Sequence, residues 1–478
     1  MRYNIQRILF IFELLLIFFS KLHFSLSQFS NLDDYFISYK PSNDIGDFKN
    51  YIQTVFDDKI KSDPDGTYSQ SQNQTISSIN QKIPGVFEII LEKSIADYLK
   101  DQDEISSLEP DTSTKVGFRE SNKAGERSFF IDQSNDSESQ STNRALKINT
   151  SVSIIKATLS LALLSTIPLL INSNVPKYTV QSFPPWQLSA ISSMKNDYYS
   201  IFPYGSDFIT PVSNKVVIIY VIDSGVDANV SELSGRVITG KNFVEEENDD
   251  DLAGHGTAIA SVIAGTLNGV AKTAKIVSVK VLNAQNTGKL GHFLSALEWV
   301  VEDKKANYAD NPVIINFSIN IETESNALKS AFQYANDNGI LSVVSAGNDG
   351  KDACSYPPSG YPSVITVASH TANNTFDSSF SNYGKCVDIL APGEFITSSV
   401  AGTSNKIQLI SGTSLAAGIV TGVVSSVLSR YPKLSPNQAK SEVLNAGIQY
   451  QIDNLPDGTI NKRVWNGYKG KHSRMTFI

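Results

Sequence analysis

Residues 215–225 read KVVIIYVIDSG, an almost unbroken apolar run that ends in Asp-Ser-Gly. A run of this kind, without polar alternation, is typical of a strand buried on both faces of a parallel sheet. Asp223 follows the run directly, at the edge where open α/β sheets place their chemistry. The stretch therefore predicts an α/β fold with a polar site at the carboxyl end of its first buried strand.

Further apolar segments predict the rest of the sheet. Strands are expected at 215–222, 276–282, 313–317, 340–345 and 364–368, and helices near 292–303, 326–338 and 414–430. Because strands and helices alternate, we expect a doubly wound, mainly parallel sheet with helices on both faces.

Two glycine-framed motifs add a histidine and a serine. His255 lies in the stretch GHGT (254–257) and Ser414 ends the stretch SGTS (411–414), and each precedes an apolar helical segment. A serine hydroxyl becomes a useful nucleophile when an imidazole takes its proton, and a carboxylate fixes the tautomer of that imidazole. Asp223, His255 and Ser414 are therefore a candidate catalytic triad, although each residue alone also fits a turn, a cap or a surface position.

A fourth motif follows the strand expected at 340–345. The sequence continues AGNDG over residues 346–350. The amide of Asn348 could donate to an oxyanion together with the backbone N–H of Ser414. An ordinary Asn-Asp-Gly turn is the simpler alternative.

With these motifs, the chain resembles the subtilisin-like serine proteases, and specifically the fungal branch that includes proteinase K and cerevisin. The matching stretches span about residues 183–445 and read YVIDSGVD, AGHGTAIASVIAG, GVAKTAKIVSVKVLNAQNTGKLG, SVVSAGNDG, YPSVITVAS, FSNYGKCVDILAPG and SGTSLAAG. The resemblance implies a three-layer subtilisin-like fold and a serine endopeptidase (EC 3.4.21). It assigns the nucleophile to Ser414, the general base to His255, the orienting carboxylate to Asp223 and the oxyanion amide to Asn348.

The chain departs from the family pattern at three places. Ala258 stands where the family usually has histidine, Gly418 stands where it has proline, and Asn320 replaces a glycine of the Ser-Leu-Gly-Gly wall. Glycine inside a helix is unfavourable by about 0.5–1 kcal/mol relative to alanine, so the helix behind Ser414 is expected to be looser. A catalytically impaired subtilase that acts as a binding or chaperone protein is therefore an alternative.

The resemblance also implies where a peptide substrate lies. Proteases of this kind bind the peptide as an added strand. Leu290 and Ile319 near this groove favour apolar or aromatic residues on the acyl side of the scissile bond. The residues expected to line the groove are Gly288, Leu290, Ser318, Ile319, Asn320, Ser345, Ala346 and Gly347.

A structural calcium ion and a disulfide are also implied. No cofactor is expected to be required for the chemistry. Pro362, Val364 and Asp388 resemble positions that supply two carbonyls and a carboxylate to calcium in the family, although Asp388 could instead cap a turn. Cys354 and Cys386 are the only cysteines and are candidates for a disulfide, with two free thiols as the alternative.

Four regions are expected along the chain. Residues 1–27 read as a secretory signal, and 34–111 as a small α+β, ferredoxin-like inhibitory prodomain, with an unrelated small domain as the alternative. Residues 112–175 read as a linker whose hydrophobic segment, 152–171, either spans a membrane or packs on the catalytic domain. Residues 183–470 form the catalytic domain.

Composition is consistent with a secreted or vacuolar zymogen. The net charge of −8 over 478 residues gives no support for nucleic-acid binding. We expect a monomer that takes peptide or protein substrates and its own prodomain as an intramolecular inhibitor. The acidic run 245–251 reads as a solvated loop. Glycosylation sequons lie at Asn73, Asn135, Asn149, Asn229 and Asn373, and the sequon at Asn316 is expected to be buried.

Overall fold

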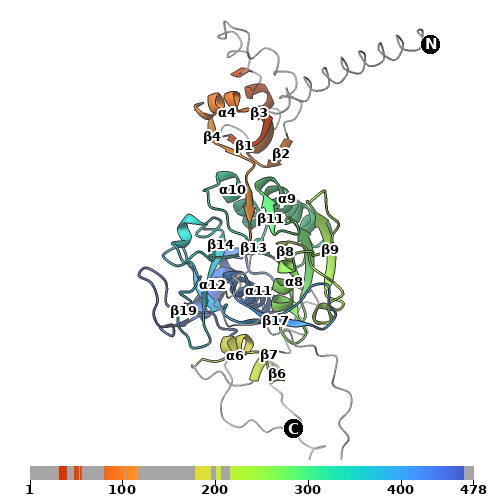
Figure 1. Ribbon diagram of the computed structural model, residues 1–478, viewed down its shortest axis with the longest axis vertical. Coiled ribbons are helices and arrows are strands. Elements are labelled where there is room, and N and C mark those ends of the chain that lie inside the picture. Colours follow the sequence, from red (N-terminus) through yellow and green to blue (C-terminus); the bar gives the residue numbers. More distant parts are fainter. Residues whose placement is uncertain are drawn as a thin grey trace, which may run out of the picture.

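The computed structural model describes residues 32–39, 48–55 (without 53), 80–116 (without 103), 178–194, 201–205 and 216–467. Figure 1 shows a small N-terminal unit, the described residues of 32–116, above a larger main domain, residues 178–467, with the last strand of the unit reaching down to that domain. The segments expected as a signal (1–27) and as a hydrophobic stretch (152–171) lie outside the described residues.

The main domain is built on a nine-stranded sheet. The strands from β9 to β15 are parallel, β19 runs parallel to β15, and only β18 is antiparallel to its neighbour. The order across the sheet is β18 (Ile448–Gln449), β19 (Lys462–Arg463), β15 (Ile389–Pro392), β14 (Val364–His370), β13 (Ile340–Ser345), β12 (Val313–Phe317), β8 (Ile218–Asp223), β10 (Lys275–Lys280) and β9 (Val237–Asn242).

This topology confirms the expected doubly wound sheet. The five predicted strands correspond to β8, β10, β12, β13 and β14, with ends that differ by a few residues. Strand β8 lies between β10 and β12, and the strands that follow it in the chain are added on one side of β8 first and then on the other. The direction in which strands are added thus reverses at β8. Ligand sites of open α/β sheets lie at such a reversal, outside the carboxyl ends of the strands. The polar site expected after β8 therefore lies at the position where this topology favours a ligand site.

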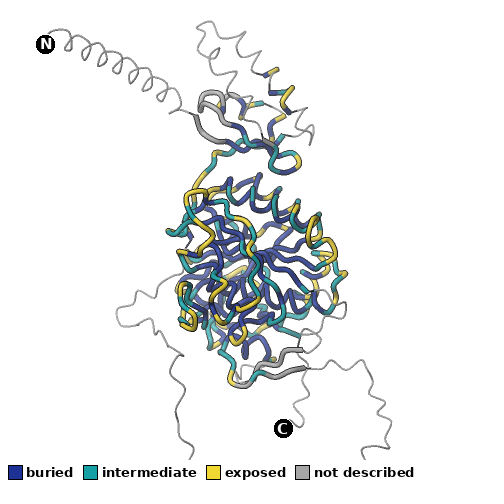
Figure 2. Tube along the Cα trace, turned by 90° about the vertical axis from the view of Figure 1, so that its right-hand side faces the viewer, coloured by how far each residue is buried: buried dark blue, intermediate teal, exposed yellow. Residues whose placement is uncertain are grey.

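Helices cover both faces of this sheet. One face carries α8 (His255–Ala264), α11 (Thr413–Arg430) and α12 (Pro436–Ala446), and the other carries α9 (Leu290–Asn307) and α10 (Asn326–Asp337). Strand β8 supplies both cores, because Ile219 and Val221 pack toward α8 and α11 while Tyr220 and Ile222 pack toward α9. Both cores lie inside the main domain as continuous buried chain in Figure 2. Burial on both faces explains why the strand sequence is continuously apolar.

Helix α11 lies at the centre of the main domain. It packs against α8, α12 and strands β12 to β15. Among the described residues it is the one helix long and apolar enough to cross a bilayer, and 89% of its apolar stretch is buried inside the protein. Its composition is that of a core helix.

The N-terminal unit has the βαββαβ order of a ferredoxin-like fold. Its antiparallel sheet has the order β2-β3-β1-β4. Its elements are β1 (Leu32–Tyr39), helical residues 48–55, β2 (Asn80–Ile83), β3 (Val86–Glu92), α4 (Lys93–Lys100) and β4 (Ile105–Pro110).

The two faces of this small sheet pack against different partners. Tyr35 and Ile37 face the unit's own helices, where Phe87 stacks on Phe48 with ring centroids 4.1 Å apart. Phe36, between them on β1, points to the opposite face and belongs to the core formed by α9 and α10. The sheet therefore lies on these two helices of the main domain, as Figure 1 shows.

The first and last parts of the main domain are joined by a buried cation. Arg463 of β19 is fully buried and donates to the carbonyls of Ala190 and Ser193. These carbonyls belong to the end of α6 (Trp186–Ser192) and to the residue after it. Two hairpins, β6 (Tyr178–Ser182) with β7 (Ile201–Gly205) and β16 (Ile396–Ser399) with β17 (Ile407–Ile410), complete the elements below the sheet.

Candidate active site

Asp223 and His255 meet at the carboxyl edge of the sheet. Asp223 ends β8 and His255 begins α8, and both side chains are fully buried. The Nδ1 atom of His255 lies 2.7 Å from Oδ1 of Asp223, hydrogen-bonding distance. Two glycines make this contact possible: Gly254 has φ of +78°, and a Cβ at Gly256 would lie 2.1 Å from the carbonyl oxygen of Gly225. The expected contact between the carboxylate and the imidazole is present.

Ser414 lies in the first turn of α11, at the same edge. Its Oγ lies 3.4 Å from the carbonyl oxygen of Ser318, and the hydroxyl of Ser318 donates to the carbonyl of Ser414 over 3.2 Å. As the second residue of the helix, Ser414 has a backbone N–H that belongs to the four without an acceptor in the helix. Both the hydroxyl and a donor for a developing oxyanion are thus supplied by one residue.

Helices α8 and α11 are in direct contact, so the histidine and serine are held by one packed pair of helices. Gly418 lies at this contact, and a Cβ there would be 3.5 Å from Ile263 and 3.6 Å from Ile259, which is ordinary van der Waals distance. Close approach of the helices therefore does not require this glycine.

Asn348 lies beside the serine helix in a fixed orientation. Its Oδ1 accepts hydrogen bonds from the backbone N–H of Thr413 at 2.9 Å and from the Thr413 hydroxyl at 2.8 Å. Because the carbonyl end of the amide is held in this way, the NH2 end is the end that can donate. The amide is thus held next to the residue before Ser414, with its NH2 group as the end left to donate.

Asp251 is a site residue that the sequence analysis missed. The acidic run 245–251 was expected to be a solvated loop, but the Asp251 carboxylate is buried and accepts four hydrogen bonds. One oxygen accepts from the Ser224 hydroxyl and the Gly254 N–H, and the other accepts from the N–H and the hydroxyl of Thr257, all over 2.6–2.8 Å. Thr257 is the third residue of α8, so Asp251 serves as the cap that glycine at the N-cap cannot supply. An aspartate four residues before a helical histidine was the available signal.

The network around Asp251 continues to the catalytic candidates. The Ser224 hydroxyl accepts from the N–H of Gly256, and the Ser224 N–H donates to Oδ1 of Asp223. Ser224 thus connects the segment before His255 with the carboxylate that contacts the imidazole. Hydrogen bonds to Asp251 and Ser224 thus fix the positions of Asp223 and of the backbone on both sides of His255.

Glu247, in the same acidic run, is also not simply solvated. It lies 3.1 Å from the ammonium group of Lys280, which is 1% exposed and also donates to the carbonyls of Ser224 and Leu282. Burial alone would raise the pKa of Glu247, but the Ala284 N–H and the Lys280 ammonium outweigh it and lower that pKa. Lys280, paired with Glu247, thus fixes the backbone carbonyl of Ser224, the residue after Asp223.

The expected groove residues lie around a strand from the N-terminal part of the chain. Residues 112–116 were assigned to a linker, but β5 (Ser113–Lys115) pairs antiparallel with β11 (Thr287–Lys289), so that Gly288 lies opposite Thr114. The Val116 N–H donates to the Asn286 carbonyl over 2.7 Å, and the Thr114 hydroxyl donates to the Asn320 carbonyl over 3.1 Å. One added strand is therefore held on both sides.

The other expected groove residues form two segments beside Ser414 and Thr413. Ser318, Ile319 and Asn320 follow β12, while Ser345 ends β13 and is followed by Ala346 and Gly347. The side chains of Leu290 and Ile319 are fully buried in the core cluster that also contains Val116.

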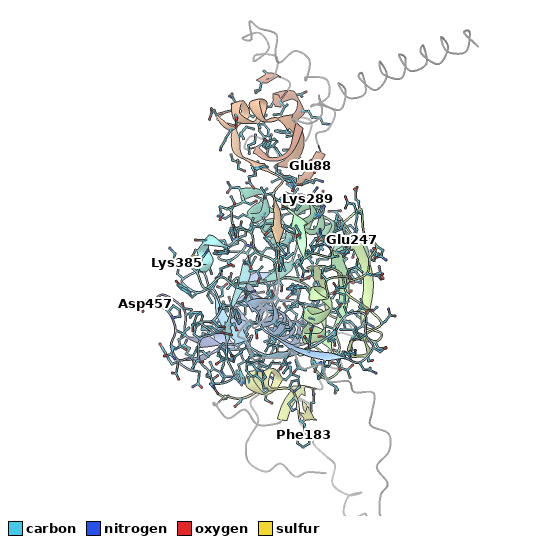
Figure 3. The ribbon with its side chains drawn as sticks, viewed as in Figure 1. Glu88, Phe183, Glu247, Lys289, Lys385 and Asp457 are labelled. Atoms are coloured by element: carbon cyan, nitrogen blue, oxygen red, sulfur yellow. A yellow bond between two sulfur atoms is a disulfide. The ribbon has the colours of Figure 1, made fainter. Side chains whose placement is uncertain are left out.

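Two acidic residues of the N-terminal unit reach helix N-termini of the main domain. Glu109 accepts from the Ser325 hydroxyl and from the N–H groups of Asn326 and Ala327 at the start of α10. Asp111 accepts from the Gly291 N–H at the start of α9 over 2.8 Å. The positive end of each helix dipole favours such a carboxylate. Glu88 and Lys289, labelled in Figure 3, lie at this junction.

The expected disulfide is present. Cys354 and Cys386 are bonded, with Cα atoms 5.2 Å apart and a sequence separation of 32 residues. By chain entropy a loop of this length contributes about 3.7 kcal/mol at most.

The expected calcium ligands do not fit a calcium ion. The ammonium group of Lys440 donates to the Val364 carbonyl over 2.5 Å and to Oδ2 of Asp388 over 3.2 Å. Two of the three ligand groups, including the only carboxylate, are thus already bonded to a cation of the chain itself. A divalent cation at these oxygens would have to displace that ammonium group. No cluster of three or more His, Cys, Asp or Glu side chains elsewhere in the described part of the chain could hold a metal.

A second buried histidine lies away from this site. Burial lowers the pKa of His370 to about 3, and its Nδ1 lies 2.9 Å from the Thr371 carbonyl. It therefore stays neutral and has a structural role.

Comparisons with known proteins agree with the fold. The Subtilase family profile matches residues 214–467. Subtilase-type proteinase psp3 of Schizosaccharomyces pombe is 33% identical over 294 residues, which are 61% of this chain and 64% of that protein. Subtilisin-like protease 2 of Trichophyton tonsurans is 39% identical over 251 residues, 52% of this chain and 58% of that protein. The chain thus spans less than two thirds of the length of these relatives.

A solved structure is similar over the same region. It is described as the crystal structure of a cold-adapted subtilisin-like serine proteinase, and it matches with a TM-score of 0.55 and 33% identity. The match covers 60% of this chain and 99% of that one, which confirms the expected subtilisin-like fold. Since the family profile matches more than half of the chain, the protein belongs to the subtilase family.

Proposed function

We propose that this chain is a serine endopeptidase that cleaves peptide bonds through an acyl-enzyme on Ser414. The observation that carries the proposal is the buried 2.7 Å contact between Asp223 and His255 at the edge where Ser414 lies in the first turn of α11. Burial of this pair keeps the imidazole in one tautomer, with Nδ1–H toward the carboxylate and Nε2 as the basic atom.

The first half of the reaction forms the acyl-enzyme. Ser414 Oγ attacks the peptide carbonyl carbon as Nε2 of His255 accepts its proton, and Asp223 stabilises the resulting imidazolium. The oxyanion accepts hydrogen bonds from the Asn348 NH2 group and the Ser414 N–H. The intermediate then collapses, the C–N bond breaks, and the imidazolium protonates the leaving amine.

The second half releases the acyl group. Water attacks the ester carbon while Nε2 of His255 accepts a proton from it; as the C–O bond breaks, the imidazolium returns that proton to Oγ of Ser414 and the acid product leaves. The chemistry needs no metal or other cofactor.

The N-terminal unit is proposed to be an inhibitory prodomain that the enzyme cleaves from itself. Its strand β5 occupies the β11 edge, the place at which proteases of this kind bind a peptide. The caps that Glu109 and Asp111 supply to α10 and α9 fix the unit on the main domain. A zymogen of this design remains inactive until the unit is released.

A secretory location, extracellular or vacuolar, is proposed as well. A disulfide is typical of an oxidising compartment. The sequon residues Asn229 and Asn373 are exposed and available for glycosylation, whereas Asn316 is fully buried, as expected. A monomer remains the expected state.

Labelling with a fluorophosphonate probe tests the proposal. The probe should modify Ser414 after release of the N-terminal unit, and Ser414→Ala should abolish both labelling and release. The expected loss in kcat is about 10⁶-fold, the loss known for this change in subtilisin. Ser426→Ala is the matched control, because Ser426 lies in the same helix and bonds only to its own turn. Absence of labelling in the released protein would favour an inactive binding or chaperone protein, and a mature form that resists carbonate extraction would favour a membrane-held one.

A further inference from the structure

The side chain on the acyl side of the scissile bond must lie next to Ser414. Two segments flank this place. Residues 318–320 contact Ser414 through the two hydrogen bonds of Ser318, and residues 345–348 reach Thr413 through Gly347 and Asn348. Any pocket for this side chain therefore lies between these two segments.

The side chain of Asn320 spans the space between the segments. Its Nδ2 lies 2.9 Å from the Ser345 carbonyl, 3.0 Å from the Tyr356 carbonyl and 3.1 Å from the Ser359 hydroxyl. Its Oδ1 accepts from the Ser345 hydroxyl over 2.7 Å. Both ends of the amide are thus bonded to the opposite wall.

The backbone of Asn320 faces the strand in the groove, because its carbonyl accepts from Thr114. The side chain extends away from that strand, toward Gly347, whose Cβ position would be 3.8 Å from Cγ of Asn320. A Cβ at Gly347 would also lie 2.3 Å from Nδ2 of Asn382. The amides of Asn320 and Asn382 thus both lie next to Gly347.

We propose that Asn320 determines specificity by filling this pocket, so that the enzyme cleaves after small residues such as glycine, alanine or serine. The inference rests on the proposed function and names its substrate class. A phenylalanine could enter only if Asn320 gave up its hydrogen bonds to Ser345, Tyr356 and Ser359, which are partly or fully buried. This proposal replaces the aromatic preference expected from Leu290 and Ile319, whose side chains are buried in the cluster that also contains Val116.

Matched peptides test the proposal. Internally quenched peptides that differ only in alanine or phenylalanine before the scissile bond are given to the released wild-type enzyme. The ratio of kcat/KM should favour alanine by about 100-fold or more. Asn320→Gly should lower this ratio at least about 10-fold by a gain on the phenylalanine peptide. Asn445→Gly, an exposed position at the end of α12, should leave the ratio unchanged.

Several outcomes would overturn the inference. A wild-type ratio near one overturns it without any variant, and so does an Asn320→Gly enzyme that keeps the wild-type ratio. If Asn320→Gly does not fold, Asn320→Ser replaces it, with the same expectation in the same direction. Fluorophosphonate labelling of Ser414 distinguishes failure of the pocket proposal from failure of the proposed protease function, because labelling does not depend on the peptide. Labelling with a ratio near one rejects only the pocket, whereas absence of labelling rejects the proposed function as well.

Discussion

The sheets of the N-terminal unit and of the main domain are both buried on two faces, but they reach this state differently. In the main domain the central strands β8 and β12 are almost continuously apolar, and helices of the same domain cover both of their faces. In the N-terminal unit only the face of Tyr35 and Ile37 is covered by the unit's own helices, while Phe36 packs on α9 and α10. The main domain thus covers its own sheet, whereas the N-terminal unit needs the main domain to cover one face of its sheet.

Two phenylalanines test which face of the small sheet depends on the main domain. Phe87 and Phe36 are both fully buried, but they lie on opposite faces of the small sheet. We expect Phe87→Ala to lower the unit's free energy of unfolding by about 3–5 kcal/mol and to unfold it. Phe36→Ala should instead release a folded unit from the main domain. Hydrogen exchange of the Ser414→Ala protein measures both, and equal exchange in the two variants would contradict the comparison.

The second change affects chemistry in the main domain alone. Asn348→Ala removes one oxyanion donor, so kcat should fall about 10²–10³-fold with little change in KM, as for such a donor in subtilisin. Steady-state kinetics on the released enzyme measure the loss. Binding of the N-terminal unit should be unaffected, because its contacts with α9, α10 and β11 do not involve Asn348. A loss of affinity for the unit as large as the loss of rate would refute this separation.

The third change removes the Lys440 ammonium group, which bonds to the Val364 carbonyl and the Asp388 carboxylate in the main domain. Lys440→Met leaves the Val364 carbonyl and the Asp388 carboxylate without their cation and should destabilise the protein by about 1–2 kcal/mol. Millimolar calcium should then raise the melting temperature of the variant more than that of the wild type, because binding to the folded state stabilises it. Differential scanning calorimetry with the exposed Lys433→Met as control measures this. A wild-type protein that gains as much from calcium as the variant would show that the lysine does not replace the ion.

The smallest expected effect lies at the junction of the two regions. Burial raises the pKa of Glu298 on α9 to about 7; nearby Glu302 and Glu88 raise it further, while Lys82 and Lys241 oppose the shift. The unfolded chain releases this proton near pH 4.5, so stability should fall as pH rises from about 4.5 to 7 and stay level above. Glu298→Gln should flatten this part of the profile of melting temperature against pH. Because Glu298 is only half-buried, the change should be small, and an unchanged profile would place its charge in solvent.

The sequence predicted the groups that carry the chemistry better than those that hold them. Asp223, His255, Ser414 and Asn348 lie in glycine-framed motifs at the ends of apolar runs, and such signals are local. Asp251 also bonds to nearby Gly254 and Thr257, and its local signal was overlooked in the acidic run. Lys280 and Lys440, in contrast, act through contacts with residues distant in the chain, so no local pattern shows them. The same holds for Asn320, where the sequence indicated a narrower groove but could not show which atoms its amide would meet.

The N-terminal unit was harder to read for a related reason. A small α+β unit was expected over 34–111, and its strands β1 and β3 carry apolar residues whose pattern is local. Strand β5 was missed, since the polar stretch Ser113–Lys115 has no apolar face of its own and becomes a strand only through pairing with β11. Its structure is dictated by the partner.

The carboxylates of Glu109 and Asp111 have one more consequence. They complete the first turns of α10 and α9, so departure of the N-terminal unit returns these helix ends to water at the moment the groove opens. Under the proposed activation, the released main domain should therefore be slightly less stable than the precursor. The same step that exposes the groove would then also weaken the two helix ends beside it.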